Sequence, residues 1–121
     1  MKRDMDLARK ILLEIERAPT ARAWIDLDMP GYSDEMVSYH VMLLAKAGLI
    51  EAVDCSSKVR FAWKATNLLW EGHDFIEAAK DDARWARAKD IVLSKGGGIA
   101  FEVLKQVLID LMKRAVLGNA V

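Results

Sequence analysis

Apolar positions near the start of the chain recur every three or four residues, which is the spacing of one helix face. They are Leu7, Ile11, Leu12, Ile15 and Ala18, with Asp4 or Asp6 placed to cap the helix and Pro19 to end it. The next segment, AWIDLD (residues 23–28), alternates apolar and acidic positions instead. This alternation predicts a short strand with one buried face.

A second helix is predicted from Ser33 to Ala47. Ser33 is a good N-cap residue, and Gly48 supplies the left-handed position that often follows a helix. At about 100° per residue, one side of this helix is apolar and should face the core. That side carries Val37, Val41 and Leu44, with His40 at its edge, where we expect the imidazole to bond a backbone carbonyl. The opposite face carries Tyr39 and Lys46 and is flanked by Ser38.

A hairpin is predicted next. The stretches LIEAVD (49–54) and KVRFAWK (58–64) read as two strands, and the short polar stretch CSS between them reads as the turn. In the second strand, alternate residues fall on opposite faces. Val59, Phe61 and Trp63 share one face, and Lys58, Arg60 and Lys64 share the other.

The remainder of the chain is predicted to be helical. A long fourth helix is expected from Thr66 or Asn67 to Leu93, with Gly72 and the pair Asp81-Asp82 as weak points. After a glycine-rich break, a final helix is expected from Ile99 to Leu117. The predicted fold class is mostly α (α+β): a winged helix-turn-helix with a small three-stranded sheet and two additional C-terminal helices. We expect residues 1–95 to form the winged-helix domain. Residues 96–121 would then pack on it or form a dimer interface.

Four stretches of the chain resemble one family. They are MKRDMDLARKILLEIE, GYSDEMVSYHVMLLAKAGLIEA, LLWEGHDFIEAAKDD and GGGIAFEVLKQVL. The resemblance is to the uncharacterised phage- and prophage-associated proteins grouped as domain of unknown function 2513, and it spans nearly the whole chain. Members often carry threonine where this chain has Leu69. The family name implies no activity. The middle stretch is also similar to the recognition helix and wing of many bacterial winged-helix regulators.

Composition limits the classes of function. The chain has 121 residues, a formal net charge of zero and one cysteine, which suits one intracellular domain without disulfides. No apolar run is long enough to span a membrane, so we expect a cytoplasmic protein. The charge is unevenly distributed: residues 21–54 carry two basic and six acidic groups, whereas residues 55–70 carry three basic groups and no acid.

Two functions from different classes fit this distribution. The first is binding of double-stranded DNA, as by a prophage transcriptional regulator. Ser38, Tyr39 and Lys46 on the second helix and Lys58, Arg60 and Lys64 in the hairpin are the candidate contacts. The second is a protein-interaction adaptor of phage origin that uses the same scaffold on a protein partner and binds no DNA. The lysines would then serve as a solvated strand face that blocks edge pairing.

Nothing in the sequence predicts an enzyme, a cofactor or a metal site. His40 and His73 lie on different predicted helices without a ligand motif, and Cys55 has no neighbouring base. The run Gly96-Gly97-Gly98 lacks the Lys-Ser/Thr ending of a phosphate-binding loop.

The last predicted helix carries the spacing of a helix-pairing seam. Its apolar residues Phe101, Leu104, Leu108, Leu111 and Ala115 follow each other in steps of three and four. One interpretation is a homodimer whose interface includes Leu104, Leu108 and Leu111. The other is that the long fourth helix covers this strip within one chain.

Overall fold

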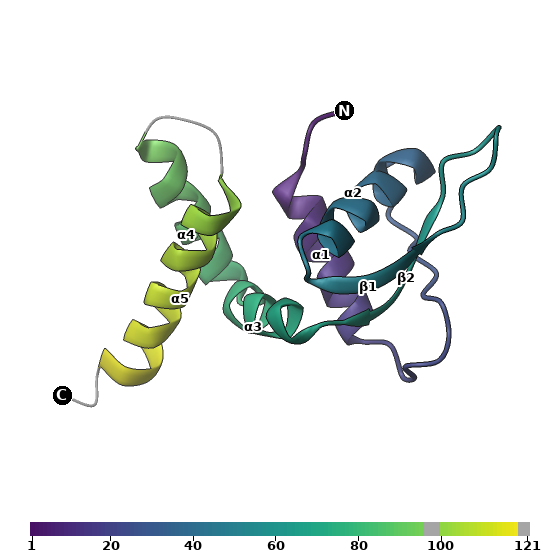
Figure 1. Ribbon diagram of the computed structural model, residues 1–121. Coiled ribbons are helices and arrows are strands. Elements are labelled where there is room, and N and C mark those ends of the chain that lie inside the picture. Colours follow the sequence, from purple (N-terminus) through teal and green to yellow (C-terminus); the bar gives the residue numbers. More distant parts are fainter. Residues whose placement is uncertain (96–99, 119–121) are drawn as a thin grey trace. The chain divides into compact units, whose positions relative to one another are not determined.

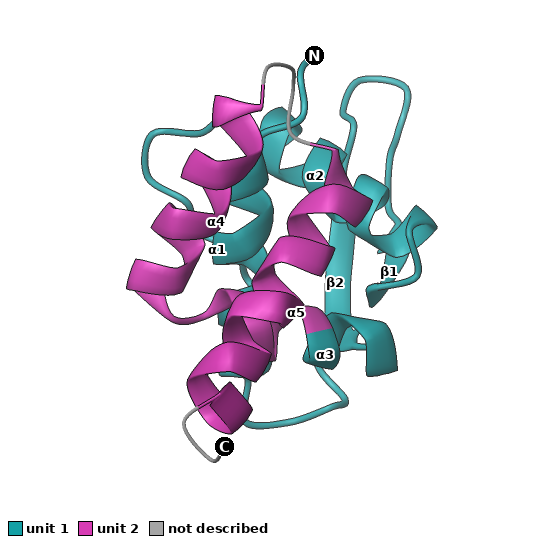
Figure 2. Ribbon diagram, turned by 90° about the vertical axis from the view of Figure 1, so that its left-hand side faces the viewer, with its two compact units in different colours: residues 1–74 teal, residues 75–121 magenta. Residues whose placement is uncertain are grey.

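The computed structural model describes residues 1–95 and 100–118, and this part of the chain is mostly helical with one two-stranded antiparallel sheet (Figure 1). Its elements are α1 (Met5–Glu16), α2 (Asp34–Lys46), β1 (Ile50–Asp54), β2 (Trp63–Leu68), α3 (Trp70–Ala79), α4 (Asp82–Ser94) and α5 (Phe101–Leu117). The chain divides into two compact units, residues 1–74 and 75–121, with the division inside α3 (Figure 2). The division predicted from the sequence lies after residue 95.

In the first unit, α1 and α2 pack on each other and on the hairpin. The predicted helix α1 is confirmed, and Asp4 is its cap: Asp4 Oδ1 accepts a hydrogen bond from the Leu7 amide at 3.1 Å. The side chains of Leu7, Ile11 and Leu12 are fully buried. The apolar stripe read from the sequence is therefore the core face of α1.

The predicted helix α2 is also confirmed, together with both of its end signals. Ser33 Oγ accepts a hydrogen bond from the Met36 amide at 3.1 Å, and Gly48 after the helix has a φ of +80°. Only glycine adopts that backbone conformation without steric strain. The predicted core residues of this helix are buried, namely Val37, Val41 and Leu44.

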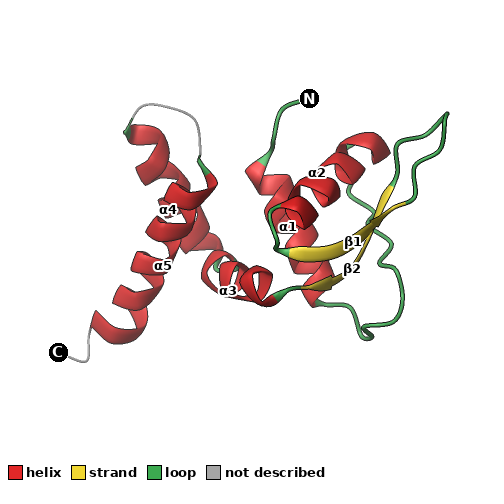
Figure 3. Cartoon of the chain, in the orientation of Figure 1, coloured by secondary structure: helices red, strands yellow, loops and turns green. Residues whose placement is uncertain are grey.

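The prediction of a third strand at residues 23–28 is wrong. This segment is a loop (Figure 3), which bonds the β2 backbone through the Ile25 amide and the Ala65 carbonyl, 2.9 Å apart. Its alternation correctly predicted burial, because Ile25 and Leu27 are partly buried while Asp26 and Asp28 are exposed. A strand also needs successive backbone hydrogen bonds to a neighbouring strand. The alternation of apolar and acidic residues predicted only which side of the segment is buried.

The hairpin was predicted in the wrong register. Its chain reversal lies at Lys58–Val59, since the Ser57 amide bonds the Arg60 carbonyl at 2.8 Å, and the stretch CSS is part of one arm. β2 consequently runs from Trp63 to Leu68 where the sequence analysis expected 58–64, and the following helix begins at Trp70. A bulge between Glu51 and Ala52 interrupts the register of the ladder.

The predicted long fourth helix is two helices, α3 and α4. Asp81 ends the run because its side chain caps α4, with Oδ1 accepting from the Arg84 amide at 2.8 Å. Gly72 is a site of close packing: a Cβ there would collide with the Leu49 carbonyl oxygen, which lies just before β1. The glycine therefore allows the start of α3 to approach the end of the α2–β1 connection.

In the second unit, α4 packs against α5. The ring of Phe75 lies edge-on to Trp85, with centroids 6.4 Å apart. Leu104 and Leu108 of α5 have no exposed surface within the single chain. These two leucines are therefore core residues of the single chain, and Leu111 is partly buried. Their place in a dimer interface stays a prediction. The predicted start of this helix at Ile99 lies outside the described residues.

Candidate nucleic-acid interface

The connection between β1 and β2, residues 55–62, is an ordered loop that projects beyond the strands (Figure 1) and is called the wing loop below. The Ser56 hydroxyl holds its two arms together: Oγ accepts from the Ala62 amide at 2.9 Å and donates to the Ala62 carbonyl at 3.3 Å. The Cys55 amide also bonds the Ala62 carbonyl, at 2.8 Å. Ser56, which was predicted to be a turn residue, thus joins the two arms of the loop by hydrogen bonds.

Asp54 holds the base of the wing loop. Its Oδ1 accepts a hydrogen bond from the Ser56 amide at 2.9 Å. Bonding to Ser56, first through the side chain and then through the backbone, lowers the pKa of the Asp54 carboxyl, and the charge of Lys46 lowers it further. The carboxylate is exposed and charged at neutral pH, so it is an acidic group beside the wing loop.

Lys58, Val59 and Arg60 form the tip of the wing loop, and all three are exposed. Val59 is 95% exposed and lies in the loop, outside the strand in which it was predicted. Arg60 Nη2 lies 3.7 Å from Asp34 Oδ2, and this ion pair joins the tip to the start of α2. The two side chains are 70% and 88% exposed, so water screens their attraction.

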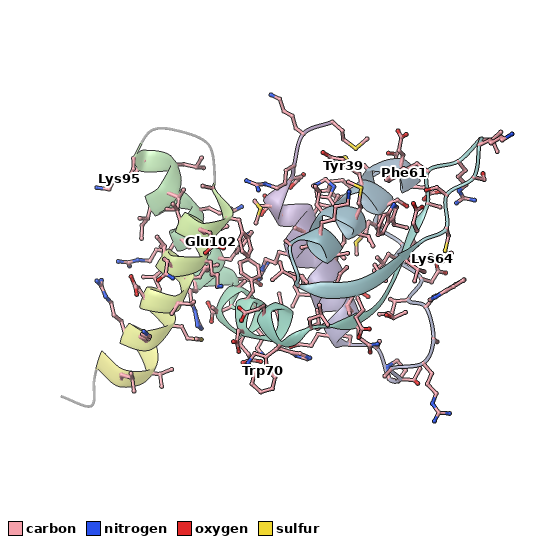
Figure 4. All side chains as sticks on the ribbon, in the orientation of Figure 1. Tyr39, Phe61, Lys64, Trp70, Lys95 and Glu102 are labelled. Atoms are coloured by element: carbon pink, nitrogen blue, oxygen red, sulfur yellow. The ribbon has the colours of Figure 1, made fainter. Side chains whose placement is uncertain are left out.

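Lys64 lies on β2, and its Nζ atom is 5.7 Å from the centroid of the Trp24 ring (Figure 4 labels Lys64). Trp24 is 57% exposed. A cavity of about 170 Å³ is lined by both Arg60 and Lys64, and by Asp34. The structure therefore brings two of the predicted basic contacts together, beside a carboxylate.

The exposed face of α2 differs from the prediction at Ser38. This residue is buried, and its Oγ accepts a hydrogen bond from the Trp63 amide at 3.1 Å. It ties α2 to β2, so it is not placed to contact DNA. Tyr39 is half-buried, with its ring edge-on to that of His40 (Figure 4 labels Tyr39), and Lys46 is exposed at the end of the helix.

The N-terminus joins this region through a contact that the sequence analysis missed. The Asp4 amide donates a hydrogen bond to His40 Nε2 at 2.8 Å, and His40 Nδ1 bonds the Met36 carbonyl at 2.8 Å. The carbonyl bond of His40 was predicted, whereas nothing in the sequence signalled the bond to Asp4. Because the hydrogen bond to His40 holds Asp4 against α2, the preceding exposed residues Lys2 and Arg3 lie near that helix.

None of the helices formed by residues 1–95 and 100–118 has both the length and the apolar character that crossing a bilayer requires.

These features define a mostly helical α+β protein with a basic, internally bonded hairpin loop. Residues 2–98 match the model of the family described as "Hypothetical protein (DUF2513)", and the chain belongs to that family. It is 40% identical over 108 residues to an "Uncharacterized protein" of Haemophilus influenzae, a match that covers 88% of this chain and 92% of the relative. No solved structure matches the chain. The family predicted from the sequence, domain of unknown function 2513, is confirmed.

Proposed function

We propose that the first unit is a winged-helix module that binds double-stranded DNA through its wing loop. The observation that carries the proposal is the exposed tip with Lys58 and Arg60, followed by Lys64, in a segment from Cys55 to Trp70 that contains no acid. Cations on a projecting hairpin loop are suited to grip phosphates or enter a minor groove. The order of α1, α2 and hairpin supports the proposal, although the sheet has two strands in the described structure.

The ion pair between Arg60 and Asp34 is compatible with this role. Exposed pairs of this kind contribute about 0–1 kcal/mol. A phosphate offers the guanidinium a stronger, bidentate partner. Arg60 can therefore exchange Asp34 for the DNA backbone at little cost.

The wing loop has the leading part in this proposal, and α2 a smaller one. The first turn of α2 exposes Asp34 and Glu35, which repel phosphates, and Ser38 is buried. Tyr39 and Lys46 are left as the contacts that α2 can supply. Binding should consequently rest on phosphate contacts, which position a protein on DNA, more than on the reading of bases. From the resemblance described in the sequence, the biological role that we propose is a cytoplasmic regulator of prophage transcription.

The salt dependence of binding to duplex DNA tests the proposal. If Lys58, Arg60 and Lys64 each neutralise one phosphate, replacing all three with alanine should flatten the log–log salt slope by about 2.7, at about 0.9 per contact. The control removes three exposed cations elsewhere, through Arg17→Ala, Lys80→Ala and Lys113→Ala together, and has the same net charge. The proposal fails if the wild-type protein does not bind duplex DNA at low salt. It also fails if the two triple variants have the same slope.

Contact with a protein partner is the second candidate function. The observation that favours it is Val59, which is 95% exposed at the tip of the wing loop, next to Arg60 and its ion pair with Asp34. An exposed apolar residue beside charged groups can be covered by the surface of a protein partner. Under this alternative, Val59→Asp would abolish capture of the partner. The variant with Lys58, Arg60 and Lys64 replaced by alanine would then have the same salt slope on DNA as the wild-type protein.

A further inference from the structure

The second unit contains a surface cavity of about 410 Å³ with three arginines in its lining. Arg84 and Arg87 come from α4, and Arg114 comes from α5. Asp81 is the acidic residue of the lining. The cavity lies wholly among residues 81–115 and shares no residue with the wing loop or α2.

The charges of this cavity are not balanced by protein groups. Within residues 1–95 and 100–118, none of the three guanidinium groups takes part in an ion pair. The Asp81 carboxylate accepts the Arg84 backbone N–H as the cap of α4, so it is already engaged. The lining therefore has an excess of positive charge.

Arg84 is the most unusual of the three arginines. Its Nη1 atom is buried and has no hydrogen-bond partner in the described structure. An arginine stays charged at every physiological pH, and a buried donor without an acceptor is unfavourable. Arg84 lies in the first turn of α4, where the backbone dipole adds positive potential. The dipole and the three guanidinium groups of the lining favour an anion in the cavity.

We infer that this cavity binds the oxyanion group of a small ligand, either a phosphate or a carboxylate. The planar fork of a guanidinium matches both groups with two parallel N–H···O bonds. A volume of about 410 Å³ is within the range of small-molecule sites. Because its arginines come from both helices, the bound anion would bridge α4 and α5 and stabilise their packing.

Calorimetric titration of the full-length protein with inorganic phosphate, and separately with succinate, tests this site. We expect saturable binding of at least one anion, and the tighter one identifies the ligand group. The same anion should raise the melting temperature. Arg84→Gln and Arg114→Gln should each weaken binding about tenfold or more, since each removes a charge-assisted hydrogen bond. The control Arg22→Gln removes an exposed arginine of the first unit and should leave the affinity unchanged.

The inference is overturned if the folded wild-type protein binds neither anion saturably. It is also overturned if the arginine variants bind as tightly as Arg22→Gln. Should Arg84→Gln fail to fold by circular dichroism, Arg114→Gln decides the matter, because Arg114 is exposed and its loss leaves no buried group unpaired. Arg84→Lys keeps the charge but lacks the fork, and should recover only part of the affinity.

Discussion

The backbone amide of Asp4 and the Nε2 atom of His40, 36 positions apart in the chain, are joined by a hydrogen bond of 2.8 Å. His40 is almost fully buried, with 1% of its surface exposed. Since Nε2 accepts this bond, the ring proton belongs on Nδ1, which then donates to the Met36 carbonyl at 2.8 Å. One imidazole therefore connects the start of α1 to the middle of α2.

The first prediction concerns this connection. His40→Phe keeps an aromatic ring but leaves the partly buried Asp4 amide without its acceptor, which should lower the free energy of unfolding by about 1–2 kcal/mol. Urea unfolding measures the change. His73→Phe is the matched control, because His73 is exposed, and it should change stability by less than about 0.5 kcal/mol. Equal stability of the two variants would show that the Asp4–His40 bond contributes nothing.

The second prediction separates a structural role of Ser38 from DNA contact. Ser38→Ala removes the acceptor of the Trp63 amide and should lower the free energy of unfolding by about 1 kcal/mol. Its affinity for duplex DNA should equal that of the wild type. Lys58→Ala should do the opposite, with unchanged stability and a salt slope flatter by about 0.9. Weaker DNA binding by Ser38→Ala would return this serine to the DNA-binding surface.

The third prediction uses the ion pair at the wing loop. Asp34→Asn removes the carboxylate that competes with phosphate for Arg60, and should therefore tighten binding to duplex DNA at low salt. Glu14→Gln is the control, since it removes the carboxylate of the exposed pair with Arg17. Fluorescence anisotropy with random duplex DNA measures both variants. Weaker binding by Asp34→Asn would contradict the proposed exchange and would favour a protein partner.

The fourth prediction is a dependence of stability on alkaline pH. Burial, and then the carboxylates of Asp4 and Asp6, raise the pKa of the Tyr32 phenol above its ordinary value of 10.0. The folded state thus disfavours the phenolate. The resulting stability is fully present below pH 10 and is lost as the pH rises through the folded pKa. Urea midpoints measured across this range should fall less steeply in Tyr32→Phe, and an identical decline in both proteins would assign it to other groups.

The fifth prediction concerns α5. Leu108 is fully buried, so Leu108→Asp should unfold the second unit and not merely separate subunits. Circular dichroism should detect the unfolding as a loss of helical signal. Val103→Asp on the same helix is the control: Val103 is 52% exposed, and the variant should retain its helical signal. A homodimer stays a prediction, and light scattering after size exclusion tests it. A folded Leu108→Asp protein of halved mass would restore the interface that was first predicted.

Signals that act over a few residues determined α1 and α2 from the sequence alone. A cap, a helical period and a terminal glycine are each read within about one turn of the chain, so Ser33 and Gly48 marked the ends of α2 correctly. The family was also evident from the chain itself, and the family match over residues 2–98 confirms it. The basic content of the wing loop was likewise visible in the sequence.

Only the tertiary structure decided what depends on partners distant in sequence. The hairpin register follows from the way the Ser56 hydroxyl bonds Ala62, which a count of polar turn residues does not reveal. Ser38 lies at the edge of the predicted exposed face of α2, and it is buried because β2 packs there and the Trp63 amide bonds its hydroxyl. Arg84 and Arg114 lie far apart in the chain and line one cavity because α4 packs on α5. Periodicity shows which face of an element is buried, whereas hydrogen-bond partners and packing across elements determine which side chains meet.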